Sequence, residues 1–145
     1  MKNVPSNAKL IGFLGLLPMV FGLLATLKLF FFSENITNFL VNFSITYSAI
    51  ILSFLGGCLF AFNCLKKDNP TLWGLILTIL PSIWATIALQ LPIFKTSLLA
   101  LGFLLIFEID RRFFKMNFTP IWWLKLRLPL TTVMIVILII MGFYV

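Results

Sequence analysis

The carboxyl-terminal stretch, residues 129–145, reads PLTTVMIVILIIMGFYV and contains no charged residue. A helix of about 20 apolar residues crosses the roughly 30 Å hydrocarbon core of a bilayer. Four other apolar runs precede it, at residues 10–32, 39–65, 72–91 and 94–109. None of them alternates apolar and polar residues as a membrane barrel strand does, so we expect helices. The sequence predicts an all-α integral membrane protein, a compact bundle of five transmembrane helices.

The composition of the whole chain agrees with this class. Hydrophobic residues make up 61% of the 145 residues, charged residues 10%, and the mean hydropathy is +1.13. Charged residues are about a quarter of a typical soluble domain. No internal repeat is visible, and the loops are too short to hold a core of their own. We therefore expect a single transmembrane domain over residues 1–145.

Polar or proline-containing segments separate the runs. The first three such breaks are residues 33–35, 66–70 and 91–92. The last connection, residues 110–128, is the longest. In it Thr119 precedes Pro120, an order that suits a helix N-cap and a proline in the first turn. The sequence predicts a short interfacial helix before the last span.

Basic residues gather on one side of the predicted bundle. The amino-terminal tail and the second and fourth loops hold Lys2, Lys9, Lys66, Lys67, Arg111, Arg112, Lys115, Lys125 and Arg127. Only Lys28 and Lys95 lie on the other side. The positive-inside rule then places the amino terminus inside and the carboxyl terminus outside. The first run lacks a small-x-small cleavage pattern, so we expect a retained span. The net charge of +7 reflects this topology, and no nucleic-acid partner is expected.

The sequence lacks the residues that several kinds of catalytic and metal site require. The chain has no histidine, which removes histidine-ligated haem and metal sites and the commonest general base. Cys58 and Cys64 lie six residues apart on one predicted helix, about 9 Å along its axis, too far for a disulfide. On a helix Glu108 and Asp110 point about 200° apart and do not form a paired-carboxylate site. We expect no enzyme activity, no cofactor and no metal.

Small residues recur every four positions in the second run. The strip consists of Ala49, Ser53, Gly57 and Ala61, and Gly56 widens it. Such a strip allows another helix to approach closely. We expect it to pack within the bundle, while a homodimer face or a gap for a ligand remain alternatives.

A polar stripe marks the third run. Thr78, Ser82, Thr86 and Gln90 follow one another at four-residue spacing around Pro81, which kinks a helix and frees a carbonyl. A kinked polar stripe can line a cavity. The alternative is that the hydroxyls bond to carbonyls of their own helix.

The fourth loop concentrates charge and tryptophan. Candidate contacts to anionic lipid headgroups are Arg111, Arg112, Lys115, Trp122, Trp123 and Lys125. Tryptophan favours the headgroup layer, and each basic residue attracts anionic lipid by about 1 kcal/mol. Asp110 and Arg127 flank the loop, and we expect them to pair because a single buried charge is costly. The pair either staples two helices or holds the polar group of a ligand.

An ordered series of motifs covers residues 12–131. It consists of GFLGLLP at 12–18, YSAIILSFLGG at 47–57, LPS at 80–82 with Trp84, Gly102 with Phe103, Asp110, PIWW at 120–123, Leu126 with Arg127, and Leu130 with Thr131. In this order the motifs resemble the small five-span family headed by transmembrane protein 69, also described as domain of unknown function 3429. The resemblance implies five spans and a bacterial or mitochondrial inner membrane, and it supplies no activity. The family usually continues after the double glycine with one residue, then His-Trp-Gly. Here Cys58, Leu59, Phe60 and Ala61 follow, so a role of that histidine does not carry over.

Two functions from different classes fit these observations. The first is a non-enzymatic accessory, stabilising or assembly partner of a larger membrane complex, in contact with anionic lipid at the inner face. The alternative is a small transporter or channel with its polar path along the third run, which requires an oligomer because five short spans rarely enclose a pathway.

Overall fold

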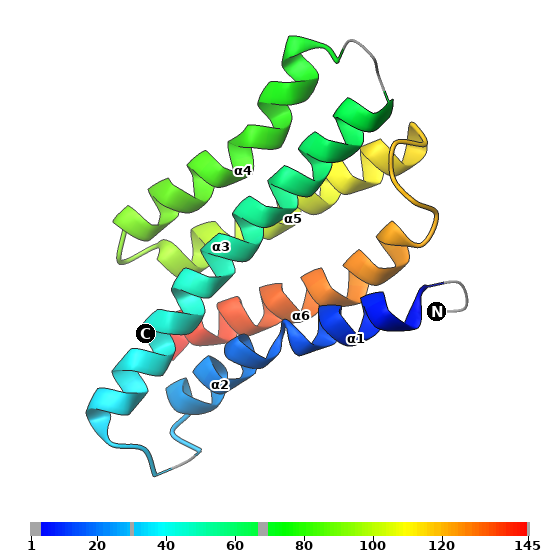
Figure 1. Ribbon diagram of the computed structural model, residues 1–145. Helices are drawn as coiled ribbons and strands as arrows, with labels where there is room; N and C mark the ends of the chain where they lie inside the picture. Colours follow the sequence, from blue (N-terminus) through cyan, green and yellow to red (C-terminus); the bar gives the residue numbers. More distant parts are fainter. Residues whose placement is uncertain (1–3, 30, 67–69, 145) are drawn as a thin grey trace.

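A computed structural model describes residues 4–29, 31–66 and 70–144. Its helical segments are α1 (Ser6–Leu14), α2 (Leu17–Thr26), α3 (Glu34–Lys66), α4 (Leu72–Gln90), α5 (Lys95–Lys115) and α6 (Trp123–Tyr144) (Figure 1). The described residues contain no β-strand. The predicted all-α class is confirmed.

Within the described residues, four helical stretches are long and apolar enough to cross a membrane. They are residues 6–26, which combine α1 and α2, together with α3, α4 and α6. Helix α5 is not among them, because only residues 96–107 separate Lys95 from Glu108, a length of about 18 Å. The chain is thus a multi-pass membrane protein with four candidate spans, and a fifth span through α5 stays a prediction.

The first span differs from its predicted bounds of 10–32. It begins at Ser6 and is interrupted between α1 and α2 at Gly15 and Leu16. Pro18 explains the interruption, since it has no amide hydrogen to donate to Leu14 and its ring crowds that carbonyl. The span ends early because Lys28 adopts a left-handed φ of 52°.

The second and fourth helices are longer than their apolar runs. Helix α3 starts at Glu34, within the polar segment taken as a break, and an acidic side chain in the first turn is favourable there. Helix α5 continues past residue 109 to Lys115. Its charged end is helical because Glu108 bonds to Arg111 and Arg112, three and four residues later.

The prediction of a separate interfacial helix before the last span is wrong. Residues 121 and 122 form a turn that leads directly into α6, and this helix passes through Pro129 without ending. The Thr119 hydroxyl is buried without a hydrogen-bond partner among the described residues, so it caps nothing there. Neighbouring helices compensate for the broken bond at a membrane proline, and here Arg127 and Thr131 on either side are buried.

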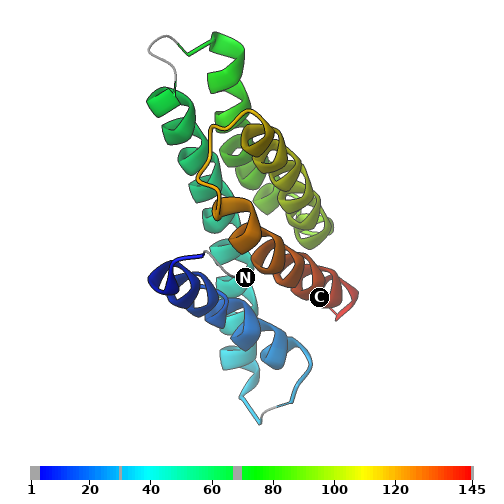
Figure 2. The same cartoon turned by 90° about the vertical axis from the view of Figure 1, so that its right-hand side faces the viewer.

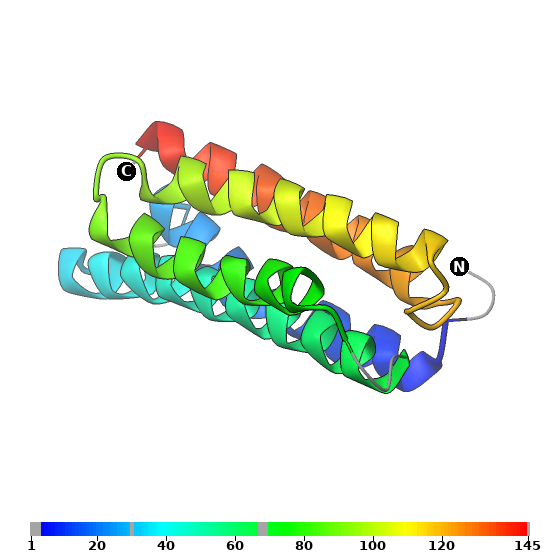
Figure 3. The same cartoon turned by 90° about the horizontal axis from the view of Figure 1, so that it is seen from above.

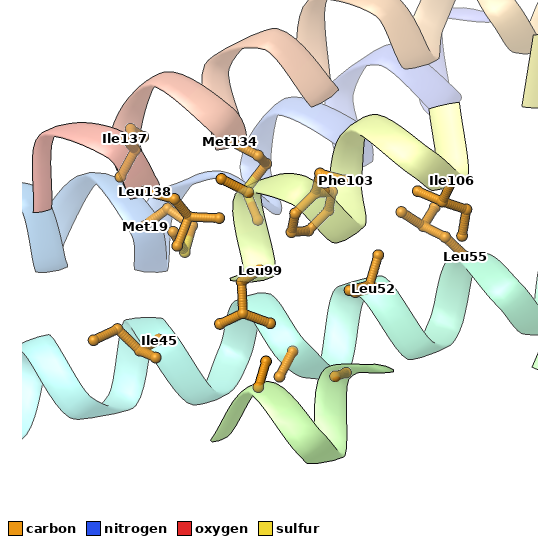
Figure 4. Close-up of a cluster of buried hydrophobic side chains, with 14 of the residues drawn as sticks. Met19, Ile45, Leu52, Leu55, Leu99, Phe103, Ile106, Met134, Ile137 and Leu138 are labelled. Atoms are coloured by element: carbon orange, nitrogen blue, oxygen red, sulfur yellow. The ribbon is translucent and has the colours of Figure 1, made fainter. Parts of the chain in front are cut away.

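Helix α3 runs through the middle of the bundle. It packs against α2, α4 and α5, while α6 packs against α5, α2 and α1. Seen from above, α5 and α6 lie on one side and α3 and α4 on the other (Figure 3). Figure 4 shows the core between them, to which α4 contributes Ala85 and Ala88. The labelled side chains come from α2, α3, α5 and α6: Met19, Ile45, Leu52, Leu55, Leu99, Phe103, Ile106, Met134, Ile137 and Leu138.

One end of the bundle collects most of the basic segments. The start of α1, the end of α3, the end of α5 and the start of α6 lie at this end, on the right of Figure 1, and we call it the basic end. Figure 2 shows the same four segments from another side. Lys2 and Lys67 lie outside the described residues. That this end faces the cytoplasm or matrix stays a prediction from the charge distribution.

Candidate functional site

The predicted contact between Asp110 and Arg127 is present at the basic end. Asp110 lies near the end of α5 and Arg127 in the second turn of α6. Arg127 Nε donates to Asp110 Oδ2 at 3.0 Å, and the side chains are 6% and 1% exposed. Removing one partner of such a buried pair leaves an uncompensated charge. The two residues therefore hold α5 and α6 together as a unit.

Trp123 completes this polar cluster. Its indole Nε1 donates to Asp110 Oδ1 at 2.7 Å, so each carboxylate oxygen accepts one hydrogen bond. The ring also packs edge-on against Phe62 of α3, with centroids 5.1 Å apart. Trp123 was predicted to contact lipid headgroups. In the structure its polar atom binds Asp110, and we define the Asp110 cluster as Asp110, Trp123 and Arg127.

A Schellman turn at the end of α5 directs the chain back toward Asp110. Asn117 has a left-handed φ of 58°. The amides of Asn117 and Phe118 donate to the carbonyls of Phe114 and Phe113 at 3.0 and 2.9 Å. Phe118 also packs edge-on against Phe113, the apolar contact usual for this motif. This turn reverses the chain so that the first two turns of α6 face the end of α5.

Of the predicted lipid contacts, Arg111, Arg112, Lys115 and Lys125 are exposed and Trp122 is half-buried. Arg111 and Arg112 donate from Nε to Glu108 at 2.8 and 3.2 Å. The hydrogen bond to Glu108 also raises the pKa of Arg111. Glu108 thus offsets one of the four exposed charges.

The polar stripe of α4 does not form a cluster. Thr78 is buried and donates to Leu75 O at 2.7 Å, and Thr86 donates to Ser82 O at 3.0 Å. Gln90 is exposed. These hydroxyls are therefore satisfied within their own helix. A groove of about 560 Å³ lies beside α4 and α5, but Ser82, Thr86 and Gln90 do not line it.

The small-residue strip of α3 divides between two environments. Ala49 is buried, and a Cβ added at Gly56 would meet the Thr78 carbonyl oxygen of α4 at 2.5 Å. A Cβ added at Gly57 would meet no described atom within 4 Å. Ser53 is half-exposed and Ala61 exposed. One part of the strip packs against α4, and the part formed by Ser53, Gly57 and Ala61 is uncovered.

The described acidic and thiol side chains do not converge on a metal site. Within residues 4–29, 31–66 and 70–144 there is no group of three His, Cys, Asp or Glu side chains that could hold a metal ion. Cys58 is half-buried and Cys64 exposed. Asp110 is buried and Glu108 faces outward, as the 200° separation on a helix requires.

Two interhelical hydrogen bonds were not predicted. The Tyr47 hydroxyl donates to the carbonyl of Gly15 at 2.9 Å, where α1 ends, and Trp84 Nε1 donates to the carbonyl of Leu98 at 2.7 Å. Both side chains stand in apolar helices, where tyrosine and tryptophan usually find a partner when buried. That rule identifies them as donors, while the acceptor depends on helix packing.

Comparison with known proteins gives one family. A family model described as "Protein of unknown function (DUF3429)" matches residues 4–143. No curated protein and no solved structure matches the chain. The predicted family resemblance is confirmed over nearly the whole chain. With its helical bundle and four candidate spans, this protein belongs to the DUF3429 family.

Proposed function

We propose that this protein is a non-enzymatic accessory or assembly partner of a larger membrane complex, located in a bacterial or mitochondrial inner membrane. The observation that carries the proposal is the uncovered part of the small-residue strip on α3. Ser53, Gly57 and Ala61 share one helix face, and Gly57 has open space above it. Strips of this kind allow a second helix to approach its backbone closely.

The surroundings of the strip support a protein partner. Phe54 and Phe60, which flank Gly57 on α3, are 63% and 39% exposed. A helix seated on the strip would pack between these rings and gain van der Waals contact that disordered lipid chains provide less well. The same helix would leave the Asp110–Arg127 pair undisturbed, because both side chains are buried.

Lipid contact at the basic end accompanies this role. Lys115 and Lys125 are exposed near the end of α5 and the start of α6. Anionic headgroups would be attracted by about 1 kcal/mol for each such charge. This attraction would fix the depth and orientation of the bundle for its partner.

Transport along α4 is the less supported alternative. The hydroxyl of Thr86 is already bonded to its own helix, and neither Ser82 nor Thr86 lines a described cavity. If transport does occur, replacing Ser82 and Thr86 together by valine abolishes solute flux in proteoliposomes. If the accessory function is correct, the parent protein supports no flux.

The test is purification from native membranes in mild detergent, followed by mass spectrometry of the proteins that accompany the chain. We compare the parent with Gly57→Trp, which fills the strip, and with Val136→Trp, which adds the same ring at an exposed position on α6. We expect a stoichiometric companion with the parent and with V136W, and its loss with G57W. A clean homo-oligomer, or a companion that G57W retains, contradicts the proposal.

A further inference from the structure

A second apolar space lies on the other side of α3 from α4. It is a cavity of about 570 Å³ between α1, α3 and α6, and its walls include Ala8, Ile11, Gly12, Ile51, Leu130 and Arg127. Pockets for small ligands measure roughly 300–1,000 Å³ and are mostly apolar with a few placed polar groups. The cavity has the size and the lining of such a pocket.

Arg127 gives this cavity a polar end. The residue is 5% exposed, and its Nε is used by Asp110. Its Nη2 is buried and has no hydrogen-bond partner among the described residues. A buried donor left without an acceptor destabilises the protein, and more so when it is charged. The group therefore favours an oxygen acceptor that enters the cavity from outside the chain.

Two other polar groups on the wall are already engaged. The Tyr47 hydroxyl donates to Gly15 O, and Trp123 Nε1 donates to Asp110. Thr131 lies one turn after Arg127 on α6, is buried, and its hydroxyl also lacks a partner within the described part of the chain. Thr131 does not line the cavity, whereas Asn7 and Trp122 do. Arg127 Nη2 is the buried charged donor on the wall that has no partner among the described residues.

The charge around Arg127 selects the kind of acceptor. Seven described basic residues lie in the segments at the basic end, against the two described acids Glu108 and Asp110; they are Lys9, Lys66, Arg111, Arg112, Lys115, Lys125 and Arg127. An anionic group is therefore attracted to the basic end as a whole. Asp110 lies against Arg127, so a group with a single negative charge is tolerated better than a doubly charged phosphate.

We propose that this cavity binds one long-chain carboxylate, a fatty acid taken from the surrounding membrane. Its carboxylate accepts a hydrogen bond from Arg127 Nη2 at the basic end. Its hydrocarbon chain lies along Ile11, Gly12, Ile51 and Leu130 toward the middle of the bundle. Since Asp110 holds Arg127 in place through Nε, the cluster that joins α5 to α6 also orients the donor for the ligand.

The experiment uses the full-length protein in phosphatidylcholine nanodiscs and a photoreactive analogue of palmitic acid. Labelling is measured by intact mass, and palmitic acid, hexadecanol and lysophosphatidic acid are added as competitors. We expect palmitic acid to compete at least tenfold more strongly than hexadecanol, which lacks the carboxylate. Equal competition by hexadecanol, or stronger competition by lysophosphatidic acid, overturns the assignment of the head group.

Three variants locate the site. Ile51→Trp fills the cavity and is expected to abolish competed labelling, whereas Leu105→Trp fills the separate groove beside α4 and α5 and is expected to leave it unchanged. Arg127→Lys keeps a charge opposite Asp110 and is expected to remove the preference for the acid over the alcohol. If I51W fails to fold, Ala8→Phe at the opposite wall replaces it. Labelling that survives in all cavity variants overturns the proposal.

Discussion

The Asp110 cluster and the polar stripe of α4 both place polar side chains in an apolar bundle, and they satisfy them in opposite ways. In the cluster, donors on α6 reach an acceptor on α5. In the stripe, Thr78 and Thr86 bond to carbonyls of their own helix. Polar bonds between helices couple those helices, while bonds within one helix do not join it to another. Side-chain hydrogen bonds therefore join α5 to α6 in the Asp110 cluster, whereas those in the α4 stripe do not join α4 to another helix.

The largest effect is expected from Arg127→Met. Methionine removes the partner of Asp110 and leaves a buried carboxylate with only the Trp123 hydrogen bond. The free energy of unfolding should fall by about 3–5 kcal/mol. Unfolding in mixed detergent micelles with increasing dodecyl sulfate measures this value. A loss below about 1 kcal/mol would mean that the pair does not hold α5 to α6.

A smaller loss is expected from Trp123→Phe. Phenylalanine keeps most of the edge-on contact with Phe62 but cannot donate to Asp110. Because the lost hydrogen bond goes to a charged group, we expect a loss of about 1.5–3 kcal/mol. The control is Trp122→Phe, whose neighbouring ring is half-buried and is not part of the Asp110 cluster. Equal losses of unfolding free energy from W123F and W122F would mean that the effect comes from ring packing and not from the hydrogen bond to Asp110.

The smallest effect is expected in α4. Replacing Thr86 by valine removes a hydroxyl that bonds only to Ser82 within the same exposed helix face. The free energy of unfolding should change by less than about 0.5 kcal/mol, as for most surface substitutions. The same micelle titration measures it. A loss as large as that of W123F would mean that α4 uses this hydroxyl to contact another helix or subunit.

The sequence predicts these two regions unequally. The Asp110 to Arg127 contact was predictable because two opposite charges stand at adjoining helix ends in a chain with few acids. The role of Trp123 was not, since tryptophan near a span end is equally expected in the headgroup layer. The continuity of α6 through Pro129 was missed because a local rule favours a break there, and packing around Arg127 and Thr131 overrides it.

Tertiary packing also determines two features that the sequence pattern does not predict, namely which part of the α3 strip is covered and where the cavity forms. Gly56 and Gly57 are adjacent and identical, yet only Gly56 lies under α4. Which of them is covered depends on the rotation of α3 against its neighbours. The cavity beside Arg127 likewise arises from three helices that are far apart along the chain. Family membership, in contrast, was readable from the order of several short motifs.

The measurement that tests the coupling of α5 and α6 most directly is a double-mutant cycle with Asp110→Asn and Arg127→Met. Asparagine keeps an oxygen that can accept from Trp123, so the cycle isolates the charge pair. We predict that each single change is strongly destabilising, and that the double variant loses about 1–3 kcal/mol less than the sum of the two. Additive losses would contradict the account, because they would show that Asp110 and Arg127 contribute independently of one another.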